Sequence, residues 1–135
     1  MEMLHNGHLI VVLSAVIQWF IGVIWYSPAL FGPSWKALVA NPAIEKKTGD
    51  TVGGLVFAVG NLIVSYLTLR FFVFTGVAGI KHGVIWGGFL WFGFFAVPLL
   101  VQYVSERRPI KLYVINAGYW LVALMVCGAV LGRLR

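Results

Sequence analysis

Four long, uncharged runs of apolar residues most constrain the fold of this chain. They cover residues 9–26, 52–69, 83–104 and 112–132, and each is between 18 and 22 residues long. At a rise of 1.5 Å per residue, helices of these lengths reach roughly 27 to 33 Å, which matches the hydrocarbon core of a bilayer. Backbone polar groups find no water in lipid, so we expect each run to be an α-helix.

The charge distribution supports a membrane environment. Hydrophobic residues make up 61% of the 135 residues and charged residues only 10%, whereas a soluble domain carries about 25% charge. The four carboxylates all lie outside the runs, and so do nine of the ten Lys and Arg residues, Arg70 near the end of the second run being the exception. The sequence therefore predicts an all-α polytopic membrane protein, a single domain over 1–135. Its up-down bundle has helices at about 8–26, 52–74, 82–104 and 111–132.

The connection after the first helix differs from the other two. Residues 27–51 contain three prolines, two of which precede a mixture of Trp, Lys and aliphatic residues at 34–40. Such a mixture is typical of a short interfacial or re-entrant helix. The connections at 75–81 and 105–111 are short, which favours antiparallel neighbours.

Small residues four positions apart indicate helix contacts. Membrane helices gain no hydrophobic energy by pairing, so close backbone approach at small residues holds them together. The residues expected to pack helices are Gly22, Gly83, Gly87, Gly128 and Gly132.

Three amides lie well inside the predicted helices, namely Gln18, Asn61 and Asn116, whereas Gln102 lies near the end of the third. Let side A be the membrane face with the N-terminus and side B the opposite face. All three amides lie roughly 7 to 14 Å below side B. An unpaired amide in hydrocarbon is costly, so we expect the three to meet. They serve either as structural hydrogen bonds or as a site for a polar ligand.

The side B rim gathers aromatic and charged residues. Together with the three amides it supplies the remaining candidate ligand-binding residues: Trp25, Tyr26, Trp35, Gln102, Glu106, Arg107 and Arg108. This rim could bind a headgroup or an anionic ligand. The alternative is an ordinary aromatic belt beside a basic loop.

Other classes of site have little support. His5, His8 and His82 share side A, but no carboxylate or thiol is placed to assist them, so we expect no metal site and no cofactor. We also expect no catalytic residues, because no nucleophile and base stand at a recognisable spacing. The basic residues form no stripe, which argues against nucleic acid as a partner.

Several stretches resemble a known family. They are Gly-Val-Ile-Trp-Tyr-Ser-Pro and its continuation over 22–35, Leu-Trp-Phe-Gly-Phe-Phe-Ala-Val-Pro over 90–98, and residues 116–120 leading to 128–132. Together they resemble the small bacterial membrane proteins grouped as domain of unknown function 1761. The resemblance implies four membrane helices and a multi-pass place in the bacterial inner, or plasma, membrane. It implies no substrate.

The favoured hypothesis for function is a non-enzymatic membrane module that associates with itself as a homo-oligomer or joins a larger membrane complex. The lipid bilayer is its first expected partner. The alternative is a small-solute transporter or channel that acts as an oligomer. A membrane enzyme acting at the headgroup interface through Glu106 with Arg107 or Arg108 is less favoured.

Overall fold

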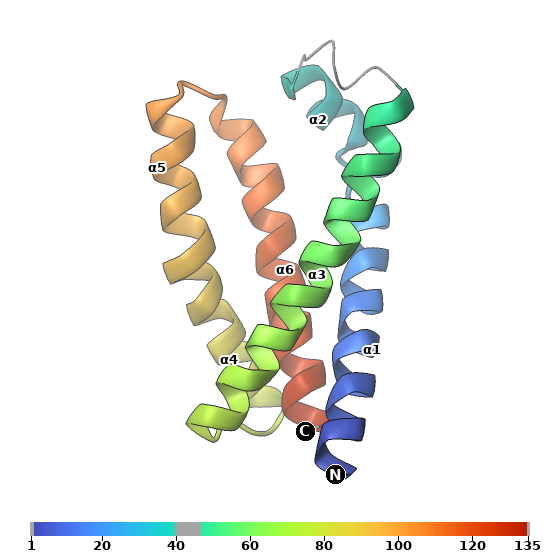
Figure 1. The fold of residues 1–135 in the computed structure, drawn as a ribbon. Coiled ribbons are helices and arrows are strands. Elements are labelled where there is room, and N and C mark those ends of the chain that lie inside the picture. Colours follow the sequence, from blue (N-terminus) through green and yellow to red (C-terminus); the bar gives the residue numbers. More distant parts are fainter. Residues whose placement is uncertain (1, 40–46, 135) are drawn as a thin grey trace.

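The structure, a computed structural model, describes the backbone of residues 2–39 and 47–134 and the side chains of residues 7–39 and 53–134. Within these ranges every regular element is a helix (Figure 1). In chain order they are α1 (Glu2–Trp25), α2 (Gly32–Val39), α3 (Lys47–Thr75), α4 (Ile80–Trp91), η1 (Phe92–Ala96), α5 (Val97–Ser105) and α6 (Ile110–Leu134).

The predicted fold class is confirmed. Among the described residues, four stretches are long and apolar enough to cross a membrane. They are Gly7–Trp25, Gly53–Thr75, Ile80–Ser105 and Ile110–Leu134. Both chain ends lie at one end of the bundle, side A, while α2 and the turn between α5 and α6 lie at the other, side B (Figure 1).

A tight turn brings α2 back against the end of α1. The backbone N–H of Phe31 donates to the carbonyl of Trp25 at 3.1 Å, and that of Gly32 donates to the carbonyl of Ser27 at 3.0 Å. A Cβ on Gly32 would overlap the carbonyl oxygens of Tyr26 and Ser27, so this approach requires glycine. The turn fixes α2 beside the side B end of α1.

The third span is interrupted by a π-helical turn. It runs as α4, η1 and α5, and the N–H of Val97 donates to the carbonyl of Phe92, five residues earlier. Pro98 follows at the start of α5 and has no N–H to give to the preceding turn. The wide turn therefore stands just before the proline, where the missing N–H would otherwise break the helical bonding.

Glycines hold the third and fourth spans together on side A. Gly83 and Gly87 on α4 face Gly128 and the backbone of Leu124 on α6, so closely that a Cβ on either would overlap carbonyl atoms. The N–H of Gly79 also donates to the carbonyl of Gly132 at 2.8 Å. These glycines let two backbones touch, which is the packing that membrane helices favour.

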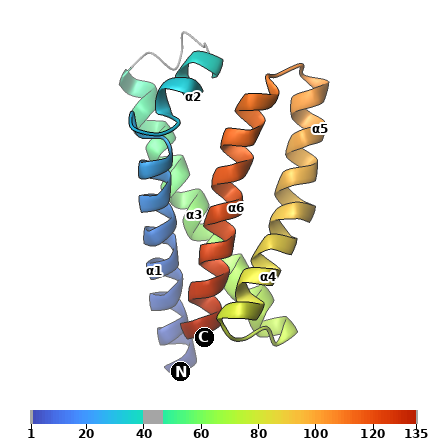
Figure 2. The same cartoon turned by 180° about the vertical axis from the view of Figure 1, so that it is seen from behind.

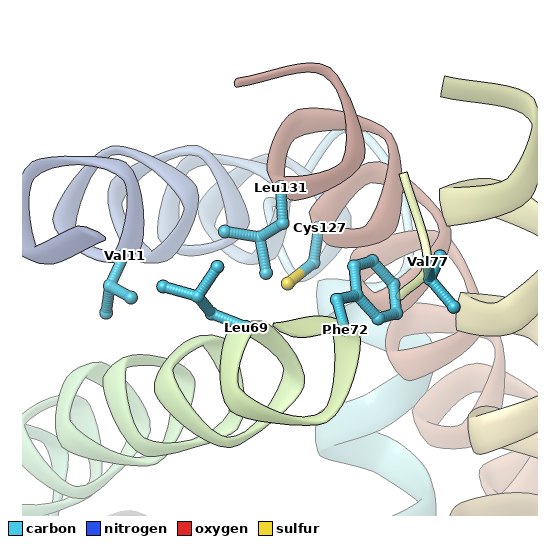
Figure 3. Close-up of a cluster of buried hydrophobic side chains, with 6 residues drawn as sticks. All are labelled: Val11, Leu69, Phe72, Val77, Cys127 and Leu131. Carbon is cyan, nitrogen blue, oxygen red and sulfur yellow. The ribbon is translucent and has the colours of Figure 1, made fainter. Parts of the chain in front are cut away.

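An apolar plug fills the side A half of the bundle between α1, α3 and α6 (Figure 3). It consists of six buried residues: Val11, Leu69, Phe72, Val77, Cys127 and Leu131. The side chains of Phe72, Cys127 and Leu131 have no exposed surface at all. The bundle is therefore closed at this end.

Helix α3 crosses the bundle at an angle (Figures 1 and 2). On side A it reaches α4, where the rings of Phe71 and Trp86 lie 6.0 Å apart. On side B it stands beside α1 and α2, away from α5. Among the described helices, α3 packs on α1 and α6, and no comparable contact joins it to α5. This divergence leaves room on side B.

Candidate ligand pocket

A pocket of about 780 Å³ occupies the space where α3 separates from α5. We call it the side B pocket. Its described lining residues come from the side B ends of five helices and the turn after α1: Trp19, Gly22, Val23, Tyr26, Gly32, Trp35, Lys36, Gly53, Gly54, Phe57, Leu99, Tyr103, Asn116 and Trp120. Its volume lies within the range of about 300 to 1,000 Å³ usual for ligand pockets.

Aromatic rings form much of the pocket wall. The ring of Trp120 stacks on Phe95 at 5.2 Å, and Phe57 lies 6.4 Å from Trp120. On the opposite side, Trp35 of α2 meets the ring of Tyr26 edge-on at 5.9 Å. Because these rings are held by one another, the wall has a fixed shape and presents apolar faces.

One edge of the pocket opens sideways. Trp19 and Val23 on α1 are exposed there, and so are Gly53 and Gly54 on α3. A Cβ on either glycine would have no atom within 4 Å, so this part of the wall is bare of side chains. All four residues belong to spans that cross the membrane, so the edge faces lipid.

A chain of three polar side chains crosses the pocket lining. The hydroxyl of Tyr26 donates to Oδ1 of Asn116 at 2.8 Å, and Nδ2 of Asn116 donates to the hydroxyl oxygen of Tyr103 at 2.8 Å. The three come from the turn after α1, from α6 and from α5, so their alignment depends on the whole bundle. Bonding holds the amide at a fixed orientation in the wall.

A second polar group, which we call the polar cluster, lies deeper. Nε2 of Gln18 donates to Oγ of Ser65 at 2.6 Å and to Oγ of Ser14 at 3.1 Å. The hydroxyl of Tyr119 lies 2.9 Å from the carbonyl of Gln18 and 3.0 Å from Oδ1 of Asn61. All five side chains are buried. Within the described part of the chain, Oε1 of Gln18 is buried without a hydrogen-bond partner.

Tyr119 separates the pocket from the polar cluster. Its ring lies 5.2 Å from that of Phe57 and 5.9 Å from that of Tyr26, both pocket residues, while its hydroxyl points into the cluster. Below the cluster, Cys127 of the apolar plug comes within 3.9 Å of Ser65. From side B to side A, the bundle thus contains the side B pocket, the ring of Tyr119, the polar cluster and the apolar plug, in that order.

The structure brings some predicted site residues together and separates others. Tyr119 contacts the amide oxygen of Asn61 and the backbone carbonyl of Gln18, while Asn116 joins Tyr26 and Tyr103. The expectation that the three amides form one group is therefore wrong. On α6, Asn116 lies three residues nearer side B than Tyr119, which contacts Asn61 and Gln18. Of the rim aromatics, Tyr26 and Trp35 line the pocket.

The rest of the predicted rim lies outside the pocket lining. Nε1 of Trp25 donates to the carbonyl of Ile115 at 2.9 Å, which ties α1 to α6. At the turn between α5 and α6, Nε2 of Gln102 donates to Glu106 at 2.7 Å, and Arg108 lies 3.4 Å from the same carboxylate. Arg107 stands in that turn with a φ of 56°. The four side chains at this turn are exposed, and Glu106 is engaged by Gln102 and Arg108.

The predicted packing glycines lie inside the bundle. Gly83, Gly87, Gly128 and Gly132 lie in the contact between α4 and α6, and Gly22 gives space to the ring of Phe57. Of the histidines, His8 and His82 are exposed, and the side chain of His5 is outside the described residues.

Sequence reasoning missed several residues of the wall. Trp19, Phe57, Leu99 and Trp120 lie within uniformly apolar runs, so nothing in their spacing separates them from lipid-facing neighbours. The sequence placed Lys36 only in a predicted interfacial helix and not in a binding site. Tyr119 lies three residues from Asn116, a helical spacing from a predicted site residue, and that neighbourhood was the one usable signal.

Comparison with known proteins gives a family and no activity. No curated protein and no solved structure matches the chain. A family model described as protein of unknown function (DUF1761) matches residues 9–132, nearly the full length. The chain is thus a multi-pass helical membrane protein that belongs to the DUF1761 family.

Proposed function

We propose that this chain is a non-enzymatic membrane module that binds one amphipathic small molecule in the side B pocket. The observation that carries the proposal is the pocket itself, about 780 Å³ with aromatic walls and a hydrogen-bonded polar chain in its lining. Apolar walls with a few oriented polar groups are typical of small-molecule sites. Membrane helices that serve only to span pack closely at small residues, as α4 and α6 do.

The chemistry of the lining supports binding over catalysis. The described lining residues offer phenols, an amide and the ammonium of Lys36, without a carboxylate, imidazole or thiol beside them. General acid–base catalysis most often uses histidine, and the two phenols of this lining are hydrogen-bonded to the amide of Asn116. Glu106, the centre of the less favoured enzyme hypothesis, is engaged by Gln102 and Arg108 at the turn.

Filling the pocket tests the proposal. We would titrate delipidated protein in mild detergent with lysophosphatidylcholine and count bound molecules by native mass spectrometry. Gly54→Leu puts a side chain at the open edge of the pocket, whereas Gly60→Leu adds the same group to the same helix at a position outside the lining. Leucine forms helix better than glycine by roughly 1 kcal/mol, so neither change should unfold α3.

We expect wild type and Gly60→Leu to bind one molecule each and Gly54→Leu to bind at least about tenfold more weakly. Equal binding by both variants would place the probe elsewhere on the protein and contradict the proposal. No binding by the wild type would also contradict it.

Association with a second copy or with a larger membrane complex stays part of the proposal as a prediction. The glycines at 83, 87, 128 and 132 pack within the chain, so they do not support it, and an oligomer would use other faces. Native mass spectrometry in mild detergent tests this directly. A strict monomer without partners at all concentrations would contradict the prediction.

A transporter is the second candidate, and one observation favours it. The polar cluster continues inward from the pocket, and Oε1 of Gln18 gives it an unpartnered acceptor. The apolar plug closes side A, so any transport requires that closure to open. Translocation of fluorescent lysophosphatidylcholine in proteoliposomes should exceed that in empty liposomes and fall in Gln18→Leu. Translocation unchanged by Gln18→Leu would count against this route.

A further inference from the structure

The side B pocket has a charge bias that indicates its ligand class. We propose that its occupant is an anionic amphiphile from the bilayer. Its phosphate or carboxylate lies at Lys36, and its hydrocarbon chain follows the aromatic wall and leaves through the open edge. This inference rests on the proposed function, because it assumes that the pocket binds a small molecule.

The first support is the charge of the lining. Among the described residues that line the pocket, the charged side chain is that of Lys36, and no Asp or Glu accompanies it. The guanidinium of Arg108 lies 5.2 Å from the ring centre of Tyr103, but it is paired with Glu106, so the net charge at the pocket is that of Lys36. A cation beside low-dielectric walls attracts an anion more strongly than the same cation in open water.

The second support is the direction of the hydrogen bonds. Tyr26 donates to Asn116, and Asn116 donates to Tyr103. The phenol oxygen of Tyr103 is therefore an acceptor in this chain, and its own proton is left to donate. The side-chain nitrogen of Asn116 carries two protons, of which the bond to Tyr103 uses one, so the second can also donate. With the ammonium of Lys36, these protons make the lining rich in donors, so it suits a ligand headgroup rich in acceptor oxygens.

The third support is the shape of the pocket relative to the membrane. Lys36 is exposed on α2, and α2 lies at the side B end of the bundle (Figure 1). Trp19 lies seven residues before Tyr26, and so roughly 10 Å deeper in the bilayer. The open edge at Trp19, Val23, Gly53 and Gly54 faces lipid. A freely soluble anion would use the cation but not this apolar depth, whereas an amphiphile uses both.

The test compares probes that share one acyl chain and differ in charge. Delipidated protein would be titrated with lysophosphatidylglycerol, which is anionic, and with lysophosphatidylcholine, which has no net charge. Inorganic phosphate serves as the free headgroup. Lys36→Gln removes the cation from the lining, Lys36→Arg keeps the charge, and Lys81→Gln removes an exposed cation at the other end of the bundle.

We expect wild type to prefer lysophosphatidylglycerol by about fivefold, the size of one favourable charge contact near a surface. Lys36→Gln should abolish the preference and still bind both probes, while Lys36→Arg and Lys81→Gln should retain it. Inorganic phosphate at millimolar concentration should displace neither probe.

Four results would overturn the inference. Equal binding of both probes by wild type, with Gly54→Leu still blocking them, would refute the ligand class and leave the proposed function standing. A preference that survives Lys36→Gln would place the anion elsewhere. Displacement by millimolar phosphate would show that a soluble anion, and no amphiphile, is the ligand. Failure of both probes to bind would overturn the proposed function as well.

Discussion

The two halves of this bundle are built in opposite ways from similar apolar sequence. On side A, α4 meets α6 through facing glycines, and the apolar plug fills the space between α1, α3 and α6. On side B, α5 packs far less closely on α6, and large rings and a hydrogen-bonded polar chain surround a pocket. Small residues close one half, and bulky residues keep the other open.

The difference follows from where each helix pair makes its closest contact. The backbones of the third and fourth spans touch at Gly83 and Gly128, and that contact acts as the fixed end of the pair. Toward side B, the third span continues through the π-turn η1, and the rings of Trp91 and Tyr113 bridge it to the fourth span. Both rings bond to backbone carbonyls across the gap, at 2.8 Å to Ala117 and 2.6 Å to Ala96. The open half is thus supported by side chains and not by backbone contact.

The largest expected effect breaks the closed half. Gly83→Val puts a branched side chain against the backbone of Gly128, and we expect it to lower the free energy of unfolding by about 3 kcal/mol. Gly88→Val is the control, since a Cβ there meets no atom within 4 Å. Unfolding in mixed micelles followed by circular dichroism measures both. Equal stability of the two variants would show that the glycine contact does not hold the helices.

A smaller effect tests the boundary between the halves. Tyr119→Phe removes the hydroxyl that lies between the carbonyl of Gln18 and Oδ1 of Asn61. The change leaves Oδ1 of Asn61 buried without this donor. We expect a loss of about 1 kcal/mol, the usual value of such a bond between membrane helices. Tyr66→Phe on the exposed face of α3 should change stability by less than half of that. The same unfolding assay measures both variants. If Tyr66→Phe lowered the free energy of unfolding as much as Tyr119→Phe, the buried bond would not be the cause of the loss.

The smallest effect concerns the rim of the open half. Trp35→Ala removes the ring that meets Tyr26 edge-on, so α2 should loosen by about 0.5 kcal/mol while the four spans stay as they are. Hydrogen exchange would show faster exchange of the α2 amides and unchanged protection in α6. Faster exchange spread over α6 would mean that α2 supports the whole bundle.

The sequence was informative about the spans and weak about the pocket, for one physical reason. Long uncharged runs must cross lipid as helices, so composition alone predicts the four spans. Each helix here is apolar nearly all round, because one face meets protein and the other meets lipid. Periodicity therefore does not tell Leu99, which lines the pocket, from Leu100, which does not.

Pairing of the polar residues shows the same limit. Gln18, Asn61 and Asn116 were recognisable because amides are rare in membrane helices. Their partners depend on the rotation and tilt of each helix, and above all on the slope of α3 (Figure 1). Tyr119 links the first two only because its ring passes between Phe57 and Tyr26. Spacing along one helix does not encode such a crossing.

The central claim, a pocket open on side B above a closed side A half, is tested most directly by thiol accessibility. Cys127, the only cysteine in the chain, lies fully buried in the plug. Thiols react through the thiolate, which forms in water and not in lipid or a dry core. Leu99→Cys places a thiol in the pocket lining, and Leu100→Cys places one at a similar depth outside the lining. Both variants also carry Cys127→Ala, so each has a single thiol.

With a charged methanethiosulfonate added to protein in liposomes, we predict that Leu99→Cys reacts at least about tenfold faster than Leu100→Cys. Cys127 in the wild type should not react. A Cys127 that reacts as fast as Leu99→Cys, or a Leu99→Cys no faster than its neighbour, would contradict the account.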